Sequence, residues 1–323
     1  MGAGIFPNLI NRIRFWNMSV VLIGTSPVMV AVVRTLSHAA RSDKSVLLLG
    51  ETGTGKDLAA RKIHELSSRG SYPFVAINCS NLPEGLFESE LFGHARGAFT
   101  GAVHEKAGLL DIAGNGTVFL DEIGELALHL QAKILRLLDK KESRKLGGTQ
   151  TKTVTARFVF ATNKDLMIKV QDGSFRSDLY YRISVIRIKI PALRERRGDL
   201  PELVKHFVET ENRRNNTQKI LAPDALNKIM SYDFPGNVRE LENILERSFV
   251  FADRDLIRAE DLRFDLEPGI SQAESTSRLL ARTLEQCHWN KTRAASKLGK
   301  SRRQLYRLLD KHDMRACIKK MVL

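Results

Sequence analysis

The segment Gly50-Glu51-Thr52-Gly53-Thr54-Gly55-Lys56-Asp57 is the most informative part of this sequence about its fold. Its spacing is that of a P-loop, in which glycines let backbone N–H groups turn toward phosphate oxygens and the lysine reaches the β- and γ-phosphates. The apolar run 45–49 precedes it and predicts a buried parallel strand. Residues 57–68 follow with helical spacing that places Leu58, Ile63 and Leu66 on one side. We therefore expect all eight residues of the loop to bind a nucleoside triphosphate.

The sequence Val118-Phe-Leu-Asp121-Glu122 resembles the strand end that completes such a site. Asp121 would hold Mg²⁺, and Glu122 would orient the water that attacks the γ-phosphate of ATP. An acidic pair after an apolar run can also begin a helix. Its place downstream of a P-loop favours the ATPase interpretation. Asp57 stands where Ser or Thr usually binds Mg²⁺, and a carboxylate can bind the ion through water.

Further strands are predicted at 74–77, 117–120, 157–161 and 185–190, and they alternate with helices. This pattern predicts an α/β fold with a parallel sheet covered on both faces. Asn163 lies at the end of one strand, at the edge where such sheets bind ligands. A turn residue is the alternative interpretation of Asn163.

After Pro191 the pattern predicts helices over 199–212, 223–231 and 236–250, without a further strand. Residues 265–276 have the composition of a linker. The expected parts of the chain are an N-terminal extension (1–19), an α/β ATPase domain (20–190), a helical lid domain (191–264), the linker (265–276) and a C-terminal domain (277–323).

The charge of the chain is concentrated at its C-terminal end. The 323 residues carry a formal net charge of +14. From Ser271 onward there are 13 Lys or Arg and 4 Asp or Glu, whereas the first 270 residues hold 38 and 33. A basic tail on a nearly balanced body indicates a module that binds a polyanion. A solvated basic surface is the alternative.

Cysteine usage and hydropathy indicate a cytoplasmic protein. The three cysteines form no CxxC pair, which argues against a disulfide framework or a structural zinc site. The apolar run 20–33 is broken by Gly24 and Pro27, so we expect no membrane span. A signal peptide is the alternative for this end, although no cleavage pattern stands out. Met18 could be the true start.

The order of these motifs resembles that of the sigma-54-dependent activators, the bacterial enhancer-binding proteins of the AAA+ class. The resemblance covers about 23–264 and resumes in the C-terminal module. Its most specific part is Glu88-Ser-Glu-Leu-Phe-Gly-His94 followed by the loop Gly97, Ala98, Phe99, Thr100, Gly101 and Ala102. The resemblance implies that this loop touches sigma-54 and moves with the state of the nucleotide.

The composition of the loop is itself informative. Small residues and two glycines leave little side-chain mass to anchor it. Phe99 at the tip is costly to leave in water without a partner. A tight turn with Phe99 packed inward is the alternative.

The resemblance also assigns roles position by position. It implies that Asn78 is a switch that pairs with Glu122, and that Asn163 senses the γ-phosphate. It further implies that Arg176 and Arg182 reach into a neighbouring subunit's site, where an arginine supplied in trans raises the rate by roughly 10³–10⁵. A surface ion pair, with Asp178 available, is the alternative for these arginines. Arg239 matches the lid residue that senses nucleotide, and residues 146–148 match a second mobile loop.

The departures from the family pattern are small. Asp57 replaces the usual Glu, Ala192 replaces a proline, and Gly108-Leu-Leu-Asp111 stands where Gly-Arg-Phe-Glu is common. Many family members begin with a receiver or ligand-sensing domain, and none fits before Val20. Control would then come from a regulatory protein in trans, from expression level, or be absent.

The sequence of the C-terminal module predicts a helix-turn-helix. A short helix ends at Gly299, and the next carries Leu305, Leu308 and Leu309 on one face. This resembles the Fis-type module of the same family. A helical pair that packs on protein is the alternative. The candidate DNA-binding residues are Ser301, Arg302, Arg303, Gln304, Tyr306 and Arg307.

The resemblance implies a ring, expected to be a hexamer, that binds upstream double-stranded DNA and uses ATP and Mg²⁺ to remodel the closed complex of the sigma-54 RNA polymerase holoenzyme. A AAA+ ATPase with a different protein client on DNA is the first alternative, and the intact loop argues against it. A DNA-binding repressor with a merely structural ATPase fold is the second. The retained Glu122 and paired arginines argue against that.

Overall fold

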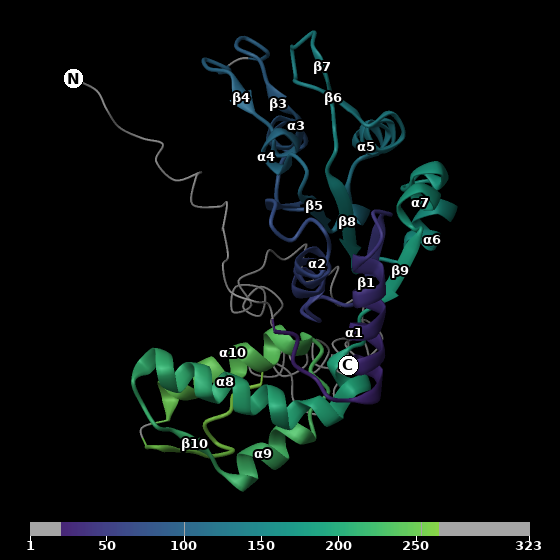
Figure 1. Cartoon of the computed structure of the whole chain (residues 1–323). Coiled ribbons are helices and arrows are strands. Elements are labelled where there is room, and N and C mark those ends of the chain that lie inside the picture. Colours follow the sequence, from purple (N-terminus) through teal and green to yellow (C-terminus); the bar gives the residue numbers. More distant parts are fainter. Residues whose placement is uncertain (1–20, 100, 253, 265–323) are drawn as a thin grey trace, which may run out of the picture. The chain divides into compact units, whose positions relative to one another are not determined.

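A computed structural model of the chain describes residues 21–99, 101–252 and 254–264 (Figure 1). Thr100 and the expected DNA-binding module lie outside these residues, so the structure does not test the predictions made for them. The chain divides into two compact units. The first runs to Thr217 and includes Phe234–Leu245, and the second combines Gln218–Asp233 with the chain from Glu246 onward.

A five-stranded sheet forms the centre of the first unit. Its strand order is β2-β5-β8-β1-β9, and all neighbours are parallel. The strands are β2 (Phe74–Asn78), β5 (Thr117–Asp121), β8 (Arg157–Thr162), β1 (Val46–Leu49) and β9 (Ile186–Lys189). The central strand β8 is buried along its whole length, as expected for a parallel strand with helices on both faces. The predicted α/β class and its five strands are confirmed.

Helices cover both faces of this sheet. On one face, α1 (Pro27–Ala40) and α2 (Lys56–Glu65) share a core with Val46 and Leu48. Leu47 enters the core on the other face, because successive side chains of a strand point to opposite sides. That second core includes side chains of α3 (Glu84–Phe92), α4 (Leu109–Ala113), α5 (Leu128–Lys140) and α7 (Ser177–Ile183).

The buried face of α2 differs from the one expected. Ile63 is buried, but Leu58 and Leu66 are 40% and 45% exposed. Ala59 and Ala60 take their place in the core. Small side chains let a helix approach the sheet closely, and apolar spacing alone does not show which side will do so.

Two short hairpins stand at one end of the first unit (Figure 1). One pairs β3 (Gly93–His94) with β4 (Lys106–Ala107), and the other pairs β6 (Glu142–Arg144) with β7 (Thr151–Thr153). A bridge between His94 and Leu146 joins them, and the Leu146 N–H donates to the Gly93 carbonyl at 3.0 Å. The loop between β3 and β4 contains residues 97–102.

The chain after β9 is mostly helical. It forms a short irregular 3-10 segment, η3 (Leu193–Asp199). Three helices follow, α8 (Leu200–Asn215), α9 (Pro223–Met230) and α10 (Asn237–Phe251). The helix α6 itself (Leu166–Gln171) precedes α7 in the first unit. The expectation of no strand in this region was wrong, since β10 (Ile220–Leu221) pairs in parallel with β11 (Leu256–Ile257). Strands of two residues are too short to produce a periodic signal.

Lysines stabilise the second unit by reaching backbone carbonyls. Lys228 Nζ donates to the carbonyls of Ala259 at 2.7 Å and Leu262 at 3.0 Å. These bonds tie α9 to the segment after β11. In the described part of the chain, no helix combines the length and apolarity needed to cross a membrane.

Candidate active site

The P-loop joins β1 to α2 and is closed around its own lysine. Gly55 begins α2 with a φ of +95°, which glycine adopts at little cost. Lys56 is 6% exposed, and its Nζ donates to the carbonyls of Gly50 at 2.9 Å and Glu51 at 3.2 Å. The ammonium group therefore lies inside the loop, within reach of a phosphate bound there.

Asp121 and Glu122 lie at the end of β5, facing this lysine. Burial, the largest effect, and the adjacent charge of Glu122 raise the pKa of Asp121, while Lys56 opposes the rise. Glu122 adopts a left-handed backbone, φ 53° and ψ 46°, which is uncommon for a residue other than glycine. Its Oε1 lies 3.7 Å from Lys56 Nζ. A strained backbone that points a carboxylate into a ligand site is typical of functional residues.

Asn163 bridges the P-loop and Glu122. It follows β8, the strand between β1 and β5. Its backbone N–H donates to Glu122 Oε2 at 3.2 Å, and its Nδ2 donates to Thr52 Oγ1 at 3.0 Å. The sheet order thus brings the predicted γ-phosphate sensor beside both groups that it would report on.

Asn78 lies at the end of β2, in register with Asp121. Its Oδ1 accepts hydrogen bonds from the backbone N–H of Ser80 at 2.9 Å and from the Ser80 hydroxyl at 2.7 Å. Asn78 and Glu122 are both among the described residues and share no hydrogen bond here. The switch role implied by the resemblance therefore requires a rearrangement of the Asn78 side chain, and it stays a prediction.

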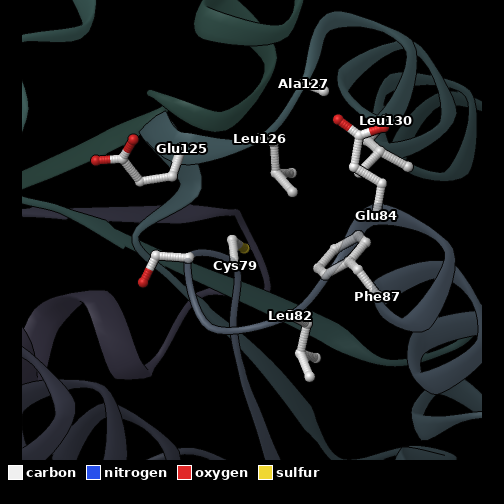
Figure 2. A pocket seen from close by; sticks show the side chains of 9 residues that line it. Cys79, Leu82, Glu84, Phe87, Glu125, Leu126, Ala127 and Leu130 are labelled. Atoms are coloured by element: carbon white, nitrogen blue, oxygen red, sulfur yellow. The ribbon is translucent and has the colours of Figure 1, made fainter.

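A cavity of about 230 Å³ lies beside this strand end (Figure 2). It separates the residues that follow Asn78 from those that follow Glu122, and Figure 2 shows the Cys79 side chain among its apolar walls. Burial raises the pKa of the Cys79 thiol, so it stays protonated and is not a nucleophile. The lining residues are Cys79, Ser80, Leu82, Glu84, Phe87, Glu125, Leu126, Ala127 and Leu130.

The carboxylates near the P-loop fit a magnesium ion. Asp57 lies in the first turn of α2, and its charge contributes to the raised pKa of Asp121. Carboxylate oxygens are hard ligands, and Mg²⁺ in nucleotide sites is usually held by one or two of them together with phosphates and water. Among the described residues no group of three or more potential metal ligands gathers, so phosphate oxygens would have to complete the coordination.

Both candidate arginine fingers are paired within their own chain. Arg176, at the start of α7, makes two bonds to Asp178, at 3.0 Å through Nε and 2.7 Å through Nη2. Arg182 lies 3.0 Å from Asp139 through Nε and donates to the Leu138 carbonyl. The pairing of Arg176 is the surface ion pair expected as the alternative. Its side chain is about half exposed, so it can exchange this partner for another anion.

Arg239 lies in the first turn of α10, beside the P-loop. Its backbone N–H donates to the Gly53 carbonyl at 3.3 Å, and its side chain is exposed. An added Cβ at Gly53 would lie 2.2 Å from the Gly236 carbonyl oxygen, so only glycine permits this approach. The nucleotide-sensing role of Arg239 stays a prediction.

Sequence reasoning gave no separate role to a set of residues that hold the P-loop from outside. Glu51 accepts two bonds from Arg194 and one from Asn237, and Arg196 is buried and donates to the Thr54 carbonyl at 3.1 Å. The hydrogen bonds from Arg194 lower the pKa of Glu51 to about 2, with Asn237 acting in the same direction. These partners are far apart in the sequence, so no local signal could reveal them.

The loop at residues 97–102 is folded on itself by short turns. The Gly97 N–H donates to the Ala102 carbonyl at 2.8 Å, and the Ala102 N–H donates to Phe99 at 3.0 Å. Phe99 is 46% exposed and packs its edge against His94, with ring centroids 5.0 Å apart. The inward-packed alternative is therefore not what the structure shows, because nearly half of the Phe99 side chain faces solvent.

The second hairpin supports this loop. An added Cβ at Gly147, whose φ is +68°, would lie 2.8 Å from the Ala98 Cβ. Lys145 forms ion pairs with Glu105 at 2.5 Å and Asp111 at 3.9 Å. Residues 146–148 therefore lie against the first loop, as the resemblance implies.

Models of three protein families match successive parts of the chain. The sigma-54 interaction domain matches residues 22–189, the AAA+ ATPase lid domain matches 194–279, and the Fis family of bacterial regulatory proteins matches 273–312. The first match covers more than half of the chain. The chain belongs to the sigma-54-dependent transcriptional activators.

Curated activators resemble the chain over most of its length. The response regulator protein PilR of Pseudomonas aeruginosa is 42% identical over 305 residues, which is 89% of this chain and 68% of PilR. The regulatory protein AtoC of Escherichia coli is 41% identical over 91% of this chain and 68% of AtoC. A Nif-specific regulatory protein of Azorhizobium caulinodans is 48% identical over 244 residues. The chain spans 40% of the length of that activator.

Solved structures of NtrX agree with the fold. NtrX from Brucella abortus in complex with ADP has a TM-score of 0.72 at 30% identity, over 91% of this chain and 69% of NtrX. NtrX in complex with ATP has a TM-score of 0.71. The sigma-54-dependent activator described here is a AAA+ ATPase with a sigma-54 interaction domain and a Fis-type domain.

Proposed function

We propose that this activator binds upstream DNA through its C-terminal domain and uses ATP hydrolysis to remodel the closed complex of sigma-54 RNA polymerase. One observation supports this most strongly. A single compact unit holds the ATPase residues and the loop with the exposed Phe99, and α3 lies between them along the chain from Asn78 to Gly93. Because its partner would be bacterial RNA polymerase, the proposed activity takes place in the cytoplasm.

Hydrolysis follows from the contacts at the end of β5. When phosphates enter the loop, Lys56 exchanges the carbonyls of Gly50 and Glu51 for phosphate oxygens. Glu122, held by the Asn163 N–H, then orients a water for in-line attack on the γ-phosphate. Asp121 and Asp57 would hold Mg²⁺, which supplies positive charge to the phosphates.

The fingers make the site dependent on a ring. Arg176 and Arg182 leave Asp178 and Asp139 to reach the γ-phosphate bound by a neighbouring subunit, and the ring is a hexamer. Charge stabilisation by an arginine in trans contributes roughly 10³–10⁵ to the rate. ATPase activity per subunit should therefore rise steeply with protein concentration. An activity that is constant across a wide concentration range contradicts sharing of the site between subunits.

Coupling to sigma-54 is assigned to the loop. Loss of the γ-phosphate changes the contacts of Asn163 and Glu122, and Asn78 carries the change into α3 and the hairpin. Phe99 and Thr100 at the tip then alter their contact with sigma-54. In this proposal DNA recognition uses the second helix of the C-terminal domain, Ser301 to Arg307, and a regulatory protein in trans controls assembly.

Binding to sigma-54 in the presence of ADP-aluminium fluoride, which mimics the transition state, tests this assignment. Wild type should form a stable complex, and Phe99→Ala should lose it while it still hydrolyses ATP. Val103→Ala is the matched control, because Val103 is 63% exposed just outside the loop motif. A AAA+ ATPase with a different client is favoured if wild type hydrolyses ATP and binds no sigma-54.

A further inference from the structure

Asn237 joins the phosphate loop to the start of α10. Its side chain is completely buried, and its φ of +57° is a left-handed value that Asn tolerates better than most residues. The Nδ2 atom donates to Glu51 Oε2 and to the Thr52 carbonyl, both at 3.1 Å. The Oδ1 atom accepts from the Leu193 N–H at 2.8 Å. One carboxamide thus holds a P-loop side chain, a P-loop carbonyl and the segment after β9.

The first turn of α10 also binds the P-loop. The N–H groups of Val238 and Arg239 donate to the Gly53 carbonyl at 3.0 and 3.3 Å. Amides in the first turn of a helix have no partner within the helix, so this carbonyl satisfies them. The N-terminal end of α10 therefore contacts the loop, and Asn237 stands at the junction.

These bonds fix the direction of the loop's peptide groups. In a planar trans peptide, the carbonyl and the N–H point in opposite directions. Because the Thr52 and Gly53 carbonyls are held toward α10, the N–H groups of Gly53 and Thr54 face away from it. The Thr54 N–H indeed faces the Glu51 carbonyl at 3.4 Å, the same oxygen that Lys56 approaches inside the loop. That is the side from which a P-loop binds phosphate.

Glu51 completes the arrangement. Arg194 donates to both of its carboxylate oxygens, through Nη1 at 2.8 Å and through Nη2. The carboxylate therefore lies between a guanidinium on η3 and the Asn237 amide on α10. Charge-assisted bonds of this kind are stronger than neutral ones and hold a defined geometry.

We infer that Asn237 and Glu51 are positioning residues for ATP: they hold the P-loop peptides in the phosphate-binding orientation without contacting the nucleotide. The inference rests on the ATP hydrolysis of the proposed function. The groups at the end of β5 that act on the water are not part of this arrangement. Loss of the hydrogen bonds made by Asn237 and Glu51 should therefore raise the KM for ATP more than it lowers kcat.

The substitution Asn237→Asp tests this with almost no change of shape. One oxygen of Asp still accepts from the Leu193 N–H, while the other replaces a donor and faces the Glu51 carboxylate and the Thr52 carbonyl. The KM for ATP and the Kd for a fluorescent ADP analogue should rise about tenfold or more, as expected when a buried acceptor loses its donor. The kcat should change less than the KM. Asn227→Asp, on an exposed position of α9, is the control for the added charge.

A second substitution separates positioning from folding. Glu51→Gln in the Asn237→Asp background supplies an amide that can donate to the new carboxylate, so it should recover part of the lost affinity. The melting temperature without nucleotide is measured alongside. If Asn237→Asp fails to fold, Glu51→Gln alone should still raise the Kd severalfold.

Two results overturn the inference. One is an unchanged Kd and KM in a variant that is folded at the assay temperature. The other is a double variant whose losses in affinity simply add. Failure of the proposed function has a different signature. In that case wild type does not hydrolyse ATP, whereas the Kd comparison among the variants still decides the role of Asn237.

Discussion

Lys56 Nζ lies 3.7 Å from Glu122 Oε1, although the two residues follow strands that are not neighbours in the sheet. The intervening strand β8 is followed by Asn163, which donates hydrogen bonds to Glu122 and to Thr52 of the P-loop. The residues expected to bind phosphate and the residue expected to orient the water are therefore joined by contacts within the protein itself. Each residue of this group has a distinct expected effect when it is changed.

Glu122→Gln should abolish hydrolysis and preserve ATP binding. The amide keeps the size of the side chain and can remain beside Asn163, but it is a poor acceptor for a proton of the attacking water. A fall in kcat of at least about 10²-fold, typical for the loss of a catalytic base, is expected. Steady-state ATPase assays and equilibrium nucleotide binding measure the two effects. A variant that retains wild-type kcat removes Glu122 from the mechanism.

Mixing inactive variants should restore activity if Arg176 acts in trans. Arg176→Ala subunits keep their own P-loop and Glu122, and Glu122→Gln subunits keep an intact Arg176. At an interface between the two, one complete site forms. ATPase activity of the mixture should therefore exceed that of either variant alone. A mixture of Lys56→Ala and Glu122→Gln is the control and should stay inactive, because neither subunit holds a competent site. Equal activity in both mixtures would indicate that Arg176 only forms the ion pair with Asp178 and does not act in a neighbouring site.

Gly147→Ala should uncouple the loop from hydrolysis. Its Cβ would lie 2.8 Å from the Ala98 Cβ, so the two hairpins must separate or the loop must shift. Gly114→Ala is a matched control, because Gly114 also has a positive φ, +50°, but has nothing within 4 Å of an added Cβ. Both changes place an L side chain at a positive φ, so both carry a backbone cost. Only Gly147→Ala should weaken the sigma-54 complex, measured with ADP-aluminium fluoride, while ATPase activity is retained. Equal weakening by both assigns the effect to backbone strain.

Glu51 should make the stability of the protein depend on pH in acid. Its pKa in the folded chain is about 2, below the ordinary value of 4.5. A lowered carboxyl pKa contributes stability above pH 4.5, and this contribution is lost as the pH falls from 4.5 toward 2. Because the side chain is 44% exposed, solvent screening limits the effect to about 1 kcal/mol or less. Urea unfolding of wild type and Glu51→Gln should show a difference at pH 7 that shrinks below pH 4.5. A difference that is the same at both values contradicts the ionic contribution.

The sequence was sufficient to predict the sheet and the residues at its edge. Apolar runs mark β1, β2, β5 and β8, whereas β9 alternates apolar and basic residues. Asp121 and Asn163 directly follow two of these runs. Parallel strands end at the same edge, so the position in the sequence determined the position in space. The P-loop could be predicted from the spacing of its own glycines and lysine alone.

Long-range contacts were beyond the reach of the same reasoning. Asn237 and Arg194 meet Glu51 through the path of the chain after β9, and nothing local to Glu51 indicates either partner. The face of α2 was misassigned because Ala59 and Ala60 pack on the sheet where Leu58 was expected. The two-residue strands β10 and β11 carry no periodicity, and the pairing of Arg176 with Asp178 shows one of two partners that the sequence allowed.

In vitro transcription from a sigma-54 promoter with the matching holoenzyme tests the central claim most directly. Wild type is compared with Thr100→Ala and Phe99→Ala, with an ATPase assay run on the same samples. We expect ATP-dependent transcripts from wild type, and none from the loop variants although they still hydrolyse ATP. If wild type hydrolyses ATP without opening the promoter, the loop does not act on sigma-54 and has a different client.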